Sequence, residues 1–282
     1  SAGRMREGAL PSPADQARVL HDVLTIAKRE NYRVNLIEAY DQPWKRQLEG
    51  AVGGHWGLFD ADQRRPKFDW GAAVSNHPQW RLQAAAGVAL AMVIFGAALL
   101  AARRRHPLPV RVWLGIAASA IVSGAMIGWT IANVPIESLT LGDWLRSLSW
   151  AAVATLAPVA GAAAAASEAR IPSFAQVLGR RGARVDGALA LALGVLLIAL
   201  TLLAIQAALG LVFDPRYRDF PFAALTAALT PFVVLTPALP RRRDVRASAE
   251  TLAAATLALS AIYVVFNETW SNWQAVWFAA GL

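Results

Sequence analysis

A group of polar side chains follows a short apolar run near the amino-terminal end of the chain. Residues 34–37 form the run, and Glu38, Tyr40, Asp41 and Gln42 come directly after it. The two carboxylates can titrate, whereas the amide of Gln42 can only form hydrogen bonds. This order predicts a buried strand with acid–base and hydrogen-bonding groups at its carboxyl end, which is where barrel enzymes gather their functional residues.

The element expected before this strand is an amphipathic helix. Ser12 and Pro13 supply an N-cap and a first-turn proline. Apolar residues then recur at helical spacing up to about Glu30, namely Ala17, Leu20, Val23, Leu24 and Ala27. A helix followed by a strand is one unit of a (β/α)8 barrel, although 81 residues cannot close a barrel that typically takes about 250 residues.

Three segments of this region resemble a known enzyme family. They are Glu38-Ala39-Tyr40-Asp41-Gln42-Pro43-Trp44-Lys45, His55-Trp56-Gly57-Leu58-Phe59-Asp60 and Pro66-Lys67-Phe68. Together they resemble the last strand and closing segment of glycoside hydrolase family 17, the β-1,3-glucanases and glucanosyltransferases of plants, fungi and bacteria. Fungal members carry a similar Glu-Ala-Phe-Asp-Glu-Pro-Trp-Lys segment. This chain departs from it at Gln42, where an amide replaces an acid, so Gln42 is not expected to act as an acid or a base.

The resemblance implies a fold and the location of the catalytic groups. Residues 1–81 are expected to be the C-terminal part of a family 17 glycosidase-like (β/α)8 barrel. The family's nucleophile motif, Glu-x-Gly-Trp-Pro-Ser-x-Gly, ends with residues matching Ser1-Ala2-Gly3, so the nucleophile and the acid/base glutamate are both expected upstream of Ser1. Retaining glycosidases need two carboxyls about 5 Å apart. We therefore expect no catalytic residue within this chain and no activity from the segment alone.

The same resemblance assigns sugar-binding roles to side chains of the closing segment. The expected substrate-binding residues are Glu38, Tyr40, Gln42, Trp44, Lys45 and Trp56. The two tryptophans would offer flat faces to a pyranose ring, and the other four side chains would form the floor of the sugar subsites. Two alternatives stay open: a structural ion pair for Glu38, and core packing or interface anchoring for the tryptophans, Trp70 included.

After residue 81 the chain becomes strongly apolar. The 282-residue sequence is 56% hydrophobic and 16% charged, which is too apolar for a soluble domain of this length. Stretches of roughly 20 apolar residues, each long enough to cross a hydrocarbon core of about 30 Å as a helix, recur along residues 82–282. The expected spans are Leu82 to Ala102, Val112 to Asn133, Trp144 to Ala166, Gly187 to Phe213, Phe222 to Pro240 and Ala249 to Phe266, with a seventh opening at Trp273. The fold class is therefore predicted as mixed, a barrel fragment followed by an all-α membrane bundle.

Arginines occupy every second connection between these spans. The rich connections carry Arg103, Arg104, Arg105 and Arg111, then Arg170, Arg180, Arg181 and Arg184, then Arg241, Arg242, Arg243 and Arg246. The other connections carry only Arg216 and Arg218. By the positive-inside rule the rich connections are cytoplasmic and residues 1–81 are extracytoplasmic. We expect a multi-pass protein of the bacterial cytoplasmic (inner) membrane.

The polar side chains within the spans are uncharged, and no ionisable group lies near a predicted mid-span. The polar ones, expected to satisfy backbone groups or bridge helices, are Ser119, Ser123, Thr130, Thr155, Gln206, Thr226, Thr230, Thr236 and Thr256. The alanine- and glycine-rich run 160–166 predicts close helix approach, and Pro158, Pro231 and Pro237 predict kinks. Aromatic residues expected to anchor at the interface are Trp144, Trp150, Tyr263, Trp270, Trp273 and Trp277.

Several function classes find no support in the sequence. The chain has no cysteine, and its four histidines, His21, His55, His77 and His106, show no metal-ligand spacing. Asp60 and Asp62 lack the glycine and terminal glutamate of a calcium loop. No phosphate loop or nucleotide fingerprint occurs, and the net charge of +8 follows from the arginine-rich connections rather than from a nucleic-acid site. No metal, cofactor or nucleic-acid partner is expected, and the absence of a signal-peptide pattern favours a segment of a longer polypeptide.

These observations predict a membrane-anchored enzyme that cleaves or transfers β-1,3-glucan in the cell envelope by a retaining mechanism. Attachment to membrane helices resembles bacterial family members linked to β-(1,3)/(1,6)-glucan synthesis. The expected partners are a β-glucan chain and the lipid bilayer, and the oligomeric state is not predicted. Two alternatives are a polysaccharide transporter or export component, which needs no charged path for an uncharged polymer, and a noncatalytic membrane scaffold.

Overall fold

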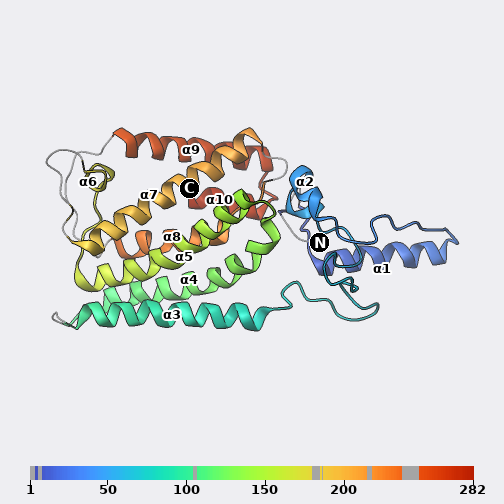
Figure 1. Ribbon diagram of the computed structural model, residues 1–282, viewed down its shortest axis with the longest axis horizontal. Helices are drawn as coiled ribbons and strands as arrows, with labels where there is room; N and C mark the ends of the chain where they lie inside the picture. Colours follow the sequence, from blue (N-terminus) through green and yellow to red (C-terminus); the bar gives the residue numbers. More distant parts are fainter. Residues whose placement is uncertain are drawn as a thin grey trace.

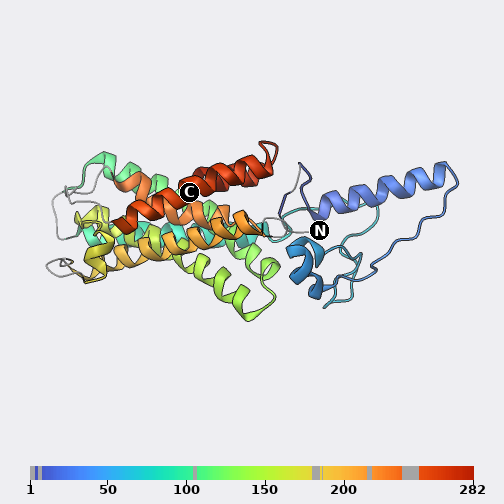
Figure 2. The same ribbon diagram turned by 90° about the horizontal axis from the view of Figure 1, so that it is seen from above.

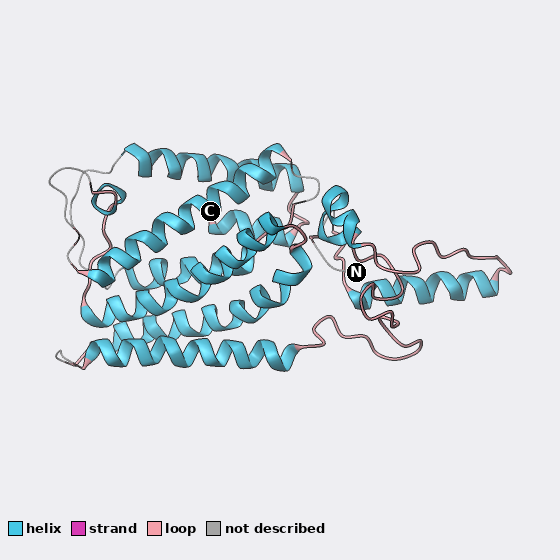
Figure 3. Ribbon diagram, in the orientation of Figure 1, coloured by secondary structure: helices cyan, strands magenta, loops and turns pink. Residues whose placement is uncertain are grey.

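The computed structural model describes residues 4–5, 8–103, 107–179, 185, 187–214, 218–236 and 248–282. They form an amino-terminal arm, residues 8–79, and a helix bundle (Figures 1 and 3). The arm contains α1 (Pro13–Arg29), the 3-10 helix η1 (Pro43–Lys45) and α2 (Arg46–Gly53). The bundle contains α3 (Trp80–Ala102), α4 (Val110–Glu137), α5 (Leu141–Ser167), α6 (Phe174–Val177), α7 (Ala188–Phe213), α8 (Phe222–Leu235), α9 (Ser248–Glu268) and α10 (Trp273–Gly281).

Helix α1 confirms the amphipathic helix predicted for the arm. The Ser12 hydroxyl accepts a hydrogen bond from the backbone N–H of Asp15, and Pro13 occupies the first turn. Lys28 and Arg29 lie in the last turn, where positive charge complements the helix dipole. Only Ala27 of the helix is buried, so α1 extends from the molecule as a largely exposed rod (Figure 2).

The predicted strand does not form, and the barrel prediction is wrong. The described residues form only isolated bridges, among them Tyr40 with Phe59 in parallel and Phe59 with Pro66 in antiparallel orientation. Residues 33–37 are not part of any strand, and Ile37 is 79% exposed. A strand needs a neighbouring backbone for its N–H and C=O groups. The apolar run has the composition of a strand, but the described chain places no ladder beside it.

The membrane prediction is confirmed in its main lines. Five helices, α3, α4, α5, α7 and α9, are long and apolar enough to cross a membrane. Helix α8 begins at the predicted Phe222 but is described only to Leu235, and Pro237 and Pro240 lie outside the described residues. Helix α10 begins at Trp273, as expected for a seventh segment. The described chain is therefore a multi-pass helical membrane protein by length and composition of its helices.

Successive helices run in alternating directions, so their connections alternate between the two ends of the bundle (Figure 1). The end of α3, the start of α4, the end of α5 and the start of α7 lie at the end farthest from the arm. Arg103, Arg111 and Arg170 flank these helix ends, and the other nine arginines of the rich connections lie outside the described residues. The arm is thus placed opposite the helix ends that carry the arginine-rich connections.

Small residues bring the helices together, as the composition predicted. A Cβ on Gly87 of α3 would lie 2.4 Å from the carbonyl oxygen of Gly124 in α4, and one on Gly128 would lie 2.6 Å from the carbonyl oxygen of Gln83. A Cβ on Gly161 of α5 would meet Pro231 of α8 at 2.7 Å. In lipid, where burial of apolar surface gives little drive for helix association, such close backbone approach supplies the packing.

Polar side chains within the spans mostly bond to backbone carbonyls, which confirms their predicted role. Ser123 of α4 donates to the carbonyl of Ala227 in α8 at 3.0 Å and so bridges two helices. The hydroxyls that bond to a carbonyl one turn earlier include those of Thr130, Thr155, Ser167, Thr201, Thr226, Thr230 and Thr236. The hydroxyl of Ser119 is buried and has no hydrogen-bond partner in the described part of the chain. Helices α5 and α8 continue through Pro158 and Pro231, and Pro237 lies outside the described residues.

Four of the six predicted aromatic anchors are exposed on the surface, namely Trp144, Tyr263, Trp270 and Trp277. Trp273 and Trp277 pack against Phe222, with ring centroids at 5.4 and 5.3 Å. Their interior faces therefore contribute to packing at the arm-side end of the bundle.

Candidate functional site

The predicted sugar-binding residues lie in a short surface segment of the arm, which we call the sugar edge (Glu38, Tyr40, Gln42, Trp44, Lys45 and Trp56). Glu38 has a left-handed backbone conformation, with φ of 64°. This turn brings its carboxylate to the ammonium of Lys45, the last residue of η1, and the two form an ion pair. Both side chains are largely buried, at 16% exposure each. Non-glycine residues rarely adopt this backbone conformation, and where they do it often marks a functional constraint.

Two tryptophans flank the Glu38–Lys45 ion pair. The ammonium of Lys45 lies 5.8 Å from the ring centroid of Trp44 and 5.4 Å from that of Trp56, within the range of cation–π attraction. Trp44 is 58% exposed and Trp56 is 44% exposed, so their ring faces remain accessible while Lys45 is held between them. The structure thus brings together four of the six predicted residues, and core packing does not account for the two tryptophans.

The other two members of the sugar edge have different surroundings. Tyr40 stacks on Phe59 with ring centroids 5.3 Å apart, and it forms the isolated bridge to the same residue. Gln42 precedes η1, and its carbonyl accepts a hydrogen bond from the backbone N–H of Lys45 at 3.0 Å. These residues shape the backbone of the edge rather than gather around the ion pair.

Asp41 is the centre of a cluster of charged side chains next to the sugar edge. Its carboxylate accepts a hydrogen bond from the Lys67 ammonium at 2.8 Å and lies 3.5 Å from the His55 Nδ1. Burial opposes ionisation of Asp41, but the hydrogen bonds and charges of His55 and Lys67 outweigh it and lower the pKa of Asp41 below its ordinary value of 3.8. Lys67 also donates to the carbonyl of His55 at 2.7 Å. This cluster fastens the segment that carries Trp56 to the segment that carries Trp44.

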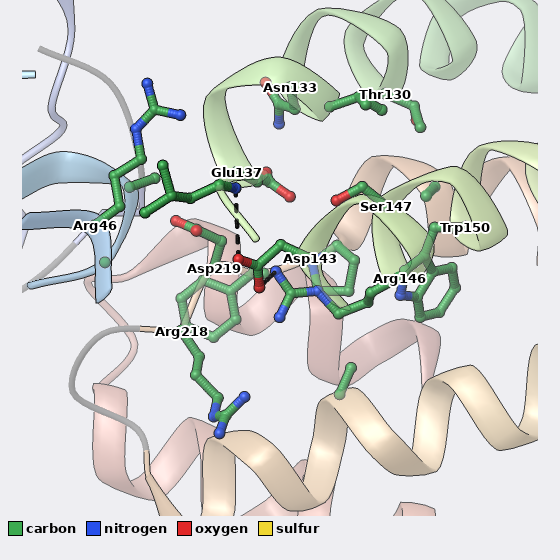
Figure 4. Close-up of a pocket in the computed structure, with 18 of the residues that line it drawn as sticks. Arg46, Thr130, Asn133, Glu137, Asp143, Arg146, Ser147, Trp150, Arg218 and Asp219 are labelled. Atoms are coloured by element: carbon green, nitrogen blue, oxygen red, sulfur yellow. Dashed lines mark hydrogen bonds and ion pairs between the residues drawn. The ribbon is translucent and has the colours of Figure 1, made fainter. Parts of the chain in front are cut away.

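A polar cavity lies where the arm meets the bundle, and we call it the junction pocket (Figure 4). Its volume is about 330 Å³. Its walls come from α2, the α4–α5 hairpin, the end of α7 and the residues that lead into α8. The side chains that define its chemistry are Arg46, Thr130, Asn133, Glu137, Asp143, Arg146, Ser147, Trp150, Arg218 and Asp219.

Most charged groups of the junction pocket already have partners. Arg46 of α2 donates to the carbonyls of Pro135 at 3.1 Å and Ser138 at 3.4 Å, which ties the arm to the α4–α5 hairpin. Asp143 closes a capping box with Thr140 at the start of α5 and lies 3.5 Å from the Arg146 guanidinium.

The α7–α8 side of the pocket contains a second ion pair. The guanidinium of Arg218 lies 3.5 Å from the carboxylate of Asp214. Three arginines (Arg46, Arg146 and Arg218) and four carboxylates (Glu137, Asp143, Asp214 and Asp219) line the pocket. The pocket therefore carries no strong excess of either charge.

Asp219 links the junction pocket to the amino-terminal end of the chain. Desolvation by burial raises the pKa of Asp219 to about 6, against the opposing charges of Arg146 and Arg4. Arg4 also pairs with Glu268 at the end of α9 and donates to the carbonyl of Arg218 at 3.1 Å. The backbone N–H of Met5 donates to the side-chain oxygen of Gln274 at 2.7 Å, and the carbonyl of Met5 accepts a hydrogen bond from the side-chain amide of Asn272 at 2.9 Å. The segment that precedes the arm is therefore docked at the same end of the bundle.

Trp150 corrects one of the predicted membrane anchors. The side chain is only 3% exposed and lines the junction pocket, so it does not lie at the lipid interface. Its indole Nε1 is buried and has no hydrogen-bond partner among the described residues. The sequence pattern misassigned it because a tryptophan near a predicted span end is typical of an interfacial anchor.

The junction pocket was not predicted from the sequence. No role was predicted for Arg46, Glu137, Asp143, Arg146 or Asp219. The only available signal was the gathering of charges around a single short hairpin. No group of three or more side chains suited to a metal ion occurs in the described ranges.

Comparison with known proteins adds no relative. No family profile, no curated protein and no solved structure matches this chain. The class that the fold defines is a multi-pass helical membrane protein with an arm at one end of the bundle. Its function must therefore be argued from the site alone.

Proposed function

We propose that this chain belongs to a membrane-anchored protein that cleaves or transfers β-1,3-glucan in the cell envelope, and that the sugar edge binds the glucan. The observation that carries the proposal is the buried Glu38–Lys45 pair between the accessible rings of Trp44 and Trp56. Aromatic faces pack on the apolar faces of pyranose rings, and a charged pair offers both donors and acceptors to hydroxyl groups. The resemblance of the same residues to glycoside hydrolase family 17 supports this substrate class.

The roles proposed for these residues are binding and positioning rather than covalent catalysis. Retaining glycosidases use two carboxyls about 5 Å apart, one as nucleophile and one as acid and base. The carboxylates of the edge region, Glu38 and Asp41, are each engaged by a lysine. The catalytic pair is accordingly proposed to lie outside the sugar edge, and the 282-residue chain alone is expected to lack hydrolytic activity.

The proposed location is the outer face of a bacterial cytoplasmic membrane. The arm lies at the opposite end of the bundle from the helix ends flanked by Arg103, Arg111 and Arg170. Positive-inside orientation then puts the sugar edge on the extracytoplasmic side, where envelope glucan is accessible. Labelling of a cysteine introduced at exposed Leu48 with an impermeant reagent on intact cells tests this side. Labelling only after the cells are opened would contradict it.

The substrate class is tested by binding and by linkage analysis. The chain in lipid nanodiscs is titrated with laminari-oligosaccharides, and Trp44→Ala is expected to weaken binding roughly tenfold because about 1–1.5 kcal/mol of stacking is lost. Trp70→Ala, at a comparably exposed tryptophan of the arm, is the matched control. Protein expressed from the complete gene is then incubated with the same sugars, and linkage analysis separates hydrolysis from transfer.

Lys45→Ala tests whether the ion pair acts on the sugar. We expect weaker binding and lower turnover, because Glu38 loses its partner and the two indole faces lose the cation between them. An unchanged dissociation constant in both Trp44→Ala and Lys45→Ala would remove the sugar edge from the glucan proposal.

A further inference from the structure

The junction pocket and the sugar edge are joined through two consecutive residues. Lys45 reaches Glu38 at the sugar edge, whereas Arg46 reaches the carbonyls of Pro135 and Ser138 in the α4–α5 hairpin. Gly50, within α2, has φ of 69° and interrupts the helix where it lines the pocket. Lys45 and Arg46 therefore place the sugar edge and the junction pocket next to each other along the chain.

The charges of the junction pocket favour a neutral ligand. The lining contains three arginines, Arg46, Arg146 and Arg218, and four carboxylates, Glu137, Asp143, Asp214 and Asp219. Two ion pairs occur within it, Asp143 with Arg146 and Arg218 with Asp214. An anion such as phosphate would need a surplus of positive charge or free arginine forks. The carboxylates that share the walls would repel it.

Four buried polar atoms of the lining have no hydrogen-bond partner among the described residues: the donors are Nε of Arg46, Nε of Arg218 and Nε1 of Trp150, and the acceptor is Oδ1 of Asp219. The Nε1 of Trp150, in a side chain only 3% exposed, is a buried donor without a partner among the described residues. The Oδ1 of Asp219 is a buried acceptor in the same condition. Figure 4 shows the indole nitrogen of Trp150 on the side that faces Arg146. Buried polar groups without partners are uncommon in folded proteins, and each calls for a ligand, a water molecule or a functional reason.

A sugar satisfies such a mixed set better than most ligands. Each hydroxyl donates one hydrogen bond and accepts others, so neighbouring hydroxyls can serve an indole N–H and a carboxylate together. On the α4 wall, the Thr130 hydroxyl donates to the carbonyl of Met126 and can still accept a hydrogen bond, and Asn133 contributes an amide. The volume of about 330 Å³ lies at the lower end of the range of about 300–1,000 Å³ that ligand pockets occupy, which suits one sugar unit and not a long chain.

We propose that the junction pocket binds one neutral hexosyl unit, held by Trp150 Nε1 and Asp219 Oδ1. This inference rests on the proposed function, because it assigns to the glucan a terminal subsite at the mouth of the membrane bundle. The hexosyl unit can come from the end of a glucan chain or from the headgroup of a glycolipid. Both sources present the same uncharged sugar hydroxyls to the pocket.

The test uses the full chain in nanodiscs made of lipids without sugar headgroups. Glucoside and maltoside detergents are avoided because their headgroups would occupy the pocket. Laminaritriose is titrated by calorimetry against the parent protein, Trp150→Phe and Asp219→Ala. We expect each substitution to weaken binding roughly tenfold, through loss of one buried hydrogen bond. The matched controls are Trp270→Phe and Asp62→Asn, at exposed positions, which should bind like the parent protein.

Each outcome separates the pocket from the edge. Weaker binding in Trp150→Phe and Asp219→Ala, with melting temperatures near that of the parent protein, supports the hexosyl subsite. If only Trp44→Ala and Lys45→Ala weaken binding, the subsite is overturned and the proposed function stands. If no variant binds differently because laminaritriose does not bind at all, both proposals fall.

Two further experiments identify the source of the hexosyl unit and test whether the pocket prefers a neutral ligand. Nanodiscs that contain glucosyl-diacylglycerol should compete with laminaritriose in the parent protein but not in Trp150→Phe if a glycolipid can supply the unit, and lack of competition assigns it to the glucan chain. Inorganic phosphate at millimolar concentration should not compete. Competition by phosphate that Asp219→Ala strengthens would show an anion site and overturn the neutral-ligand proposal.

Discussion

Apolar runs in the sequence formed the predicted secondary structure in the bundle but not in the arm. In the bundle, apolar runs of the right length became helices close to the predicted positions, as with α3, which begins at Trp80 where Leu82 was expected. In the arm, the apolar run 34–37 did not become a strand. A helix satisfies its backbone hydrogen bonds within its own segment, whereas a strand depends on a neighbour that the pattern does not specify.

The largest expected effect lies at the contact between α3 and α4. Gly87→Val places side-chain atoms against the carbonyl of Gly124 and should destabilise the bundle by about 3 kcal/mol through overpacking. Gly96→Val in the same helix is the control, because a Cβ there meets nothing within 4 Å. Thermal unfolding in sugar-free detergent measures both. Equal melting temperatures for the two variants would mean that α3 and α4 are not packed at this contact.

A smaller effect is expected from the titration of Asp219 at the junction of the two regions. Because its pKa in the folded state is about 6 against an ordinary value of 3.8, the folded protein holds a proton that the unfolded chain has released between these pH values. The free energy of unfolding should therefore fall by on the order of 3 kcal/mol as pH rises from about 4 to about 6, and then level off.

Asp219→Asn should remove most of this slope and raise the free energy of unfolding above pH 6. Unfolding of the parent protein and of Asp219→Asn at several pH values measures the difference. Asp62→Asn, at an exposed turn of the arm, is the control and should keep the slope of the parent protein. A slope retained in Asp219→Asn would show that another group titrates.

In the arm, the ion-pair cluster beneath the sugar edge should contribute about 1–2 kcal/mol. The pKa of Asp41 is lowered in the folded state, so its stabilisation is present above its ordinary value of 3.8 and is lost as pH falls through the lowered value. Asp41→Asn should weaken the contact with Lys67 and make residues 39–67 more sensitive to limited proteolysis at neutral pH. Sensitivity like that of the parent protein would show that the bridges through Phe59 suffice to hold this segment.

The smallest effect is expected where the strand prediction failed. Ile37 is 79% exposed, so Ile37→Thr should change the free energy of unfolding by less than about 0.5 kcal/mol. Ile94→Thr, at a fully buried position of α3, should cost about 2 kcal/mol and gives the contrast. A large loss of stability from Ile37→Thr would show instead that a partner covers residues 34–37.

The sugar edge was partly predictable. Glu38, Lys45, Trp44 and Trp56 were singled out from the sequence, and the structure brings them together. The first three lie within eight consecutive residues, so a single turn of η1 can gather them. The environment of Tyr40 was not predictable, because its stacking partner Phe59 reaches it through long-range bridges.

By itself the sequence determined that this is a multi-pass helical protein, where its apolar helices begin and which of their ends carry the arginines. Those features depend on local hydrogen bonding and on the length of each apolar run. Only the tertiary structure decided that Trp150 turns inward and that the junction pocket exists. The contact that ties the arm to the bundle beside the pocket, from Arg46 to the carbonyl of Pro135, joins residues 89 positions apart. No local pattern encodes which of many polar groups will meet across such a distance.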